Sequence, residues 1–62
     1  MDRAKAKQDT IQIHDQESQR FPSKNDFSYT ITDKDGVIWT VLWSRDVNVQ
    51  NPIWHVSVVE KR

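Results

Sequence analysis

The sequence predicts a mainly β or small α+β protein, built as a three-stranded antiparallel meander with strands at about residues 27–33, 37–43 and 53–60. Three observations support this: apolar residues alternate from residue 27 onward, a turn sequence lies between the first two alternating runs, and residues 1–26 are strongly polar. The 62 residues suffice for one small domain. We therefore divide the chain into a polar N-terminal segment, 1–24, and a β-sheet domain, 25–62.

The N-terminal segment consists mostly of Lys, Gln, Asp, Ser and Arg. A helix over residues 2–19 is compatible with this composition, but Met1, Ala4 and Ile11 would form only a thin apolar stripe. The alternation over residues 10–14 would equally suit a short strand. The composition favours disorder or partial order, and a short helix or strand is the alternative.

The sequence Asp33-Lys34-Asp35-Gly36 is typical of a type I turn followed by a left-handed glycine, which closes a hairpin with a bulge. This turn predicts the register of the first two strands. It sets Ile31 opposite Trp39, Tyr29 opposite Val41 and Phe27 opposite Trp43, so that the bulky residues of both strands share one face.

The third run carries Trp54, Val56 and Val58 at alternate positions. Antiparallel pairing with the second strand is expected to place Trp54 beside Trp43, Val56 beside Val41 and Val58 beside Trp39. The resulting aromatic face comprises Phe27, Tyr29, Ile31, Val37, Trp39, Val41, Trp43, Trp54, Val56 and Val58. The reverse face is expected to be rich in Ser and Thr.

A bare three-stranded sheet with one apolar face is not stable in water, so the aromatic face needs a cover. Three covers are open: the N-terminal segment, anchored by Ile11, Ile13 and Phe21; a second copy of the chain; or a different protein. We expect self-association, with a contribution from the N-terminal segment. Both sheet edges are open in principle, and the third strand is the expected joint between two copies.

Composition and charge exclude several classes of protein. Nine basic and nine acidic residues leave no net charge, which argues against a general nucleic-acid or membrane-surface binder. The chain has no cysteine, no apolar run long enough to span a bilayer and no apolar core of a signal peptide. The expected location is the cytoplasm, with no membrane association.

Candidate sites for chemistry have simpler structural interpretations. Asp33 and Asp35 lack the remaining oxygen ligands of a calcium loop and are better explained by the turn. His14 beside Asp15 lies in the least ordered part of the predicted fold, and His55 would be a solvated strand residue without a pocket. We therefore expect no catalytic residue, metal site or cofactor.

The expected function is that of a small non-enzymatic protein-binding module, an adaptor or inhibitor, acting as a homodimer, on a larger protein, or both. An accessory protein of a phage or mobile element would fit this size. The alternative is stacking of single-stranded nucleic acid on the sheet tryptophans, although few cations surround them. The aromatic face and the adjoining loop supply the expected interface: Phe27, Tyr29, Trp39, Trp43, Trp54 and Arg45.

Overall fold

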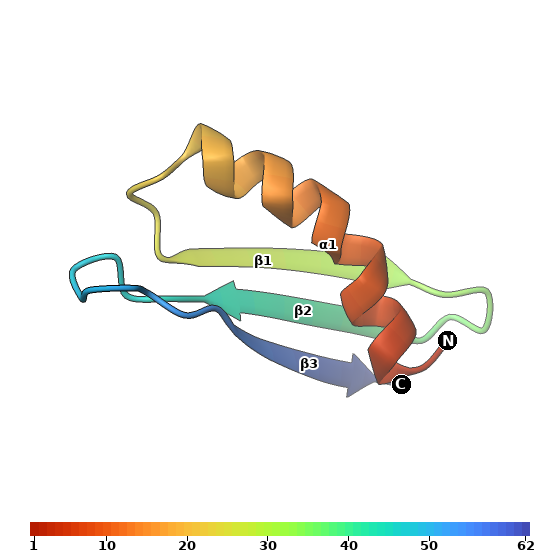
Figure 1. The fold of residues 1–62 in the computed structure, drawn as a ribbon. Helices are drawn as coiled ribbons and strands as arrows, with labels where there is room; N and C mark the ends of the chain where they lie inside the picture. Colours follow the sequence, from red (N-terminus) through yellow and green to blue (C-terminus); the bar gives the residue numbers. More distant parts are fainter.

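A computed structural model describes all 62 residues of the chain as one helix and three strands. The elements are α1 (Arg3–Arg20), β1 (Asp26–Thr32), β2 (Ile38–Ser44) and β3 (His55–Lys61). The strands form one antiparallel sheet in the order β1-β2-β3. The helix runs obliquely across one side of this sheet, giving an elongated two-layer molecule (Figure 1). The predicted three-stranded meander is confirmed, and the N-terminal segment adds a helical layer.

Helix α1 has a defined beginning and end. The Asp2 carboxylate accepts a hydrogen bond from the backbone N–H of Lys5 at 2.8 Å, which is N-capping of the first turn. At the other end, the N–H of Phe21 donates to the carbonyl of Glu17, and Pro22 follows directly. Of the alternatives that the composition left open, the helix considered over residues 2–19 is confirmed, as an 18-residue element, and the disorder that the composition favoured is not observed.

The β1-β2 hairpin has the predicted register, with Phe27, Tyr29 and Ile31 opposite Trp43, Val41 and Trp39. Gly36 adopts a φ of 79°, a region that residues with a Cβ rarely enter, and its N–H donates to the Asp33 carbonyl at 3.1 Å. This confirms the predicted turn with its left-handed glycine.

The register of β3 differs from the prediction by two residues. Val56, not Trp54, lies opposite Trp43, and Val58 lies opposite Val41. Trp54 precedes the strand, which begins at His55. Because the displacement is even, every side chain stays on its predicted face. The link between β2 and β3 is a long loop without a two-residue turn, so nothing local in the sequence determined this register.

The predicted division of the sheet into two faces is confirmed. The aromatic face packs against α1, and with Ala6 it supplies the core: Phe27, Val37, Trp39, Val41 and Trp43 are buried, and Tyr29, Ile31, Trp54, Val56 and Val58 pack around them half-buried. The opposite surface, here called the back face, has no second layer (Figure 1). Its residues are Asp26, Ser28, Thr30, Thr32, Ile38, Thr40, Leu42, Ser44, His55, Ser57, Val59 and Lys61.

Candidate protein-binding surfaces

The aromatic face predicted as an interface lies under α1. Phe27, Trp39 and Trp43 are buried, while Tyr29 and Trp54 are half-buried at its margins. Of the three covers considered from the sequence, the N-terminal segment is the one present. In this arrangement the predicted interface aromatics form the core of the chain, and a base or a partner protein would reach Trp39 and Trp43 only after α1 leaves the sheet.

The helix uses other anchors than the sequence suggested. Ile11, Ile13 and Phe21 are 39%, 50% and 45% exposed, so the predicted anchors are wrong. The buried stripe is instead Ala6, Thr10 and His14, which follow one another at intervals of four residues along one side of the helix. Small and polar residues suffice here because the bulky apolar surface comes from the rings of the sheet.

Thr10 joins α1 to the sheet by a buried hydrogen bond. Its Oγ1 accepts from the indole Nε1–H of Trp43 at 2.9 Å and donates to the Lys7 carbonyl at 2.8 Å. Trp43 thereby satisfies its only polar group within the core, as a buried indole requires. Apart from the four-residue spacing, no sequence pattern indicated this contact.

His14 sits within a group of aromatic rings. Its imidazole stacks on Trp43, with ring centroids 4.1 Å apart and planes inclined by 11°. Trp54 meets it edge-on at 4.2 Å and Phe27 at 5.5 Å. Neither ring nitrogen of His14 has a hydrogen-bond partner, so the imidazole serves here as a flat packing group.

Burial and the nearby charged groups have opposing effects on the pKa of His14. Burial lowers the pKa of His14 from its usual 6.5; the carboxylates of Asp15 and Glu17 act in the opposite direction, and the Arg45 guanidinium adds to the lowering. Asp15 Oδ1 lies 4.0 Å from Nδ1 of His14. The neutral imidazole is therefore the form that the fold favours.

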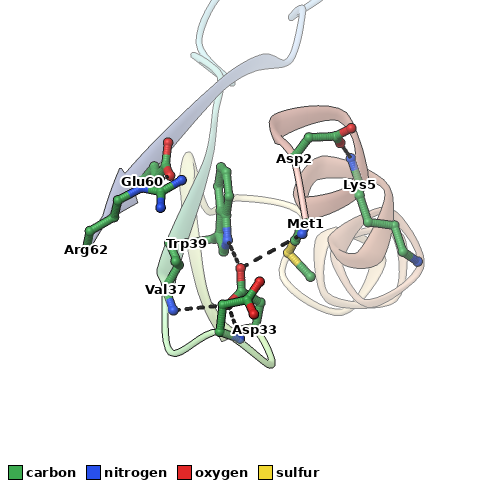
Figure 2. A network of polar contacts seen from close by, with 9 residues as sticks. Met1, Asp2, Lys5, Asp33, Val37, Trp39, Glu60 and Arg62 are labelled. Carbon is green, nitrogen blue, oxygen red and sulfur yellow. Dashed lines mark hydrogen bonds and ion pairs between the residues drawn. The ribbon is translucent and has the colours of Figure 1, made fainter.

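The Asp33 carboxylate accepts several hydrogen bonds at the turn between β1 and β2 (Figure 2). Its Oδ1 accepts from the N–H groups of Asp35 and Val37 at 2.9 and 3.0 Å, and its Oδ2 accepts from Trp39 Nε1 at 2.9 Å. The Met1 ammonium lies 4.0 Å from the same Oδ2. The Trp39 bond lowers the pKa of Asp33 against the effect of its burial, and the two backbone bonds add to the lowering. This carboxylate is engaged in structure, which agrees with the turn interpretation rather than a calcium loop.

Arg45, the predicted polar member of the interface, holds the opposite end together. Its guanidinium lies 4.3 Å from the ring centroid of Trp54 and donates to the carbonyls of Pro22 and Lys24. It thus joins the chain leaving α1 to the loop after β2 and covers the outer side of Trp54. The structure brings Arg45 together with Trp54, and both stabilise the fold at this end.

The back face carries a small aliphatic patch of three exposed residues, Ile38, Leu42 and Val59. Val59 pairs with Thr40, which lies between Ile38 and Leu42 along β2, so the three aliphatic residues are neighbours across two strands. Uncharged hydroxyl residues surround the patch: Ser28, Thr30, Thr32, Thr40 and Ser57. Charged groups occur only at the ends of the strands, at Asp26 and Lys61.

The two edges of the sheet differ. The Arg3 guanidinium donates to the carbonyl of Val58 on the outer edge of β3. Just outside the two ends of β1, the Asn25 carbonyl accepts from the N–H of Arg45 and the Asp33 N–H donates to the carbonyl of Val37, the two residues that flank β2. Antiparallel alternation then directs the backbone groups of Ser28, Thr30 and Thr32 outward. These outward groups make no hydrogen bond within the chain. The sequence did not show that a residue of α1 would bond to the outer edge of β3 while none bonds to the outer edge of β1.

The residues weighed for chemistry from the sequence are not brought together. His14 belongs to α1 and is buried between the helix and the aromatic face, whereas His55 and Ser57 lie on the back face, on the other side of the sheet. No group of three or more His, Cys, Asp or Glu side chains gathers in a way that could hold a metal ion. A shallow hollow at the end of α1 is lined by the consecutive residues 20–24 and brings in no residue from elsewhere in the chain.

Fold and surfaces together define a small α+β protein, with one helix covering the aromatic side of a three-stranded antiparallel sheet. Comparison of the chain with protein-family models, with curated proteins and with solved structures yields no match. Helix α1 does not combine the length and the apolar character that crossing a membrane requires.

Proposed function

We propose that this protein is a small non-enzymatic protein-binding module, an adaptor or inhibitor, that contacts a larger protein through the back face of its sheet. The proposal rests on one observation: Ile38, Leu42 and Val59 form an exposed patch that is surrounded by Ser and Thr residues. The aromatic face is covered by α1 and forms the core, so it leaves the back face as the exposed side of the sheet.

The composition of the back face suits protein recognition better than other contacts. Cores of protein interfaces are depleted in charged side chains, and this surface is uncharged over the middle of all three strands. A nucleic-acid surface would instead need Lys and Arg to meet the phosphates. Lys61, at the end of β3, is the only Lys or Arg in the back-face set.

The experiment compares two charge-introducing variants at exposed aliphatic positions. Leu42→Glu places a carboxylate in the back-face patch, and Ile13→Glu places one on the outer side of α1 as a matched control. Both variants and the wild type are used to capture partners from an extract, and each captured protein is purified and titrated against all three.

We expect Leu42→Glu to weaken binding of a true partner at least tenfold and Ile13→Glu to leave it unchanged, with both variants folded by circular dichroism. A partner that binds Leu42→Glu and the wild type equally well would contradict the proposal. So would a partner that loses affinity only for Ile13→Glu, since that result would assign recognition to the helix.

A further inference from the structure

We infer that two copies of this chain pair through β1 in antiparallel orientation, about a two-fold axis at Thr30, to form a continuous six-stranded sheet. The partner is a second copy, and the contact is the open edge of β1. This inference goes beyond the proposed function, because it uses an edge and the margin of the aromatic face rather than the centre of the back face.

The backbone of β1 is free for such pairing. The outward N–H and C=O groups of Ser28, Thr30 and Thr32 have no partner within the chain, and an unpaired edge is a template for another strand. β1 contains no proline or glycine, and its one charged residue, Asp26, stands at its beginning. The usual protections of an edge strand are therefore absent over the rest of β1.

The other edge is less available. The Arg3 side chain donates to the Val58 carbonyl in the middle of β3 and occupies an acceptor that an added strand would need. Pairing through β3, which was expected from the sequence, would first require this hydrogen bond to break. The structure therefore favours β1 as the joint.

Side chains select the register. An axis at Thr30 brings Asp26, the first residue of each β1, next to the Asp33–Gly36 turn of the other copy, which carries Lys34. An acidic and a basic side chain therefore approach each other at each end of the contact. Both residues are exposed and neither has an ion-pair partner within the chain. An axis at Tyr29 would instead bring the turn with Lys34 next to the segment that carries Lys24, just before β1, and so place like charges near each other. Charge complementarity therefore supports the axis at Thr30.

The same register also buries apolar side chains at the margin of the aromatic face, along β1. It pairs Tyr29 with Ile31 of the second copy, and both residues are half-buried in the single chain. An aromatic residue opposite a β-branched one is a favourable cross-strand pair. The Tyr29 hydroxyl lacks a hydrogen-bond partner, and burial together with the nearby Glu17 carboxylate raises its pKa. A contact at this margin would bury apolar surface that α1 leaves partly uncovered.

The first experiment measures mass by analytical ultracentrifugation of the full chain over a range of concentrations. Thr30→Pro removes an outward N–H that the single chain does not use, and Glu60→Pro does the same on the outer edge of β3. We expect a concentration-dependent dimer for the wild type and Glu60→Pro, and at least tenfold weaker association for Thr30→Pro. A wild type that stays monomeric up to millimolar concentration would overturn the inference, as would association lost only in Glu60→Pro.

A second experiment does not require a proline to be tolerated. Because the chain has no cysteine, Thr30→Cys introduces a single thiol. In the proposed dimer it lies at the two-fold axis, next to the same thiol of the second copy. Ser57→Cys places a matched exposed thiol on β3. Mild oxidation should cross-link Thr30→Cys into a dimer much faster than Ser57→Cys, and equal rates would contradict the pairing. Leu42→Glu tests the proposed function separately, since it should leave the dimer mass unchanged.

Discussion

The buried hydrogen bond between Trp43 and Thr10 offers the sharpest test of how α1 is attached to the sheet. Thr10→Val keeps the shape of the side chain and removes the oxygen that accepts the indole N–H at 2.9 Å. Thr10 is 2% exposed, so water cannot replace the lost acceptor without rearrangement. An unpaired buried donor costs about 1–3 kcal/mol.

This loss is large for a small chain. Domains are stable by roughly 0.05–0.15 kcal/mol per residue, which for 62 residues amounts to about 3–9 kcal/mol. A destabilisation of about 2 kcal/mol corresponds to a fall in Tm of roughly 8–16 °C. Thermal and urea unfolding followed by tryptophan fluorescence would measure it, with Thr10→Ser as the control that keeps the oxygen.

A double-mutant cycle with Trp43→Phe isolates the bond from other effects of the substitution. Without the indole N–H, Thr10→Val should cost at least about 1 kcal/mol less than it does in the wild type, because no donor is left unpaired. Equal costs in both backgrounds, or an unchanged Tm for Thr10→Val, would refute the assignment of this bond as an attachment of α1.

Further predictions concern pH, the hairpin and the helix. Because the folded state lowers the pKa of His14 below its unfolded value of 6.5, stability should be complete above pH 6.5 and fall as the pH drops toward the lowered pKa; His14→Phe should flatten this part of a pH–stability curve. Gly36→Ala should cost roughly 1–2 kcal/mol in urea unfolding, because a φ of 79° strains a residue with a Cβ although nothing lies within 4 Å of that atom. Ala6→Leu should destabilise by roughly 1–3 kcal/mol through overpacking, whereas Ile13→Lys should change the free energy of unfolding by less than about 0.5 kcal/mol; similar values for the two would contradict the assigned helix orientation.

The hairpin could be predicted from the sequence because two independent signals agree there. Asp33 and Gly36 determine the turn, and strict alternation on both strands determines the faces. The third strand has the alternation but no turn sequence of this kind. Alternation distinguishes one face from the other but does not distinguish registers that differ by two residues, and the long loop after Ser44 supplies no turn to do so.

The helix contact could not be predicted from apolar periodicity. The search for large apolar anchors pointed to Ile11 and Ile13, which face solvent, and missed Ala6, Thr10 and His14. In this packing the sheet supplies the large rings and the helix supplies small or flat groups that approach them closely. Small and flat groups on a polar helix are thus enough to cover the aromatic face, so the residues predicted as an interface lie in the core. The exposed side of the sheet is the hydroxyl-rich back face.

The single contact between Arg3 and Val58 has a consequence for the length of any assembly. Strand addition propagates into a filament when a unit offers a bare edge on both flanks. If two copies pair through β1 as inferred above, the Arg3 guanidinium on the Val58 carbonyl opposes the addition of a further strand at β3, and the assembly is expected to stop at two copies. In that arrangement, one cation from the first turn of the helix would favour a closed pair over a growing ribbon.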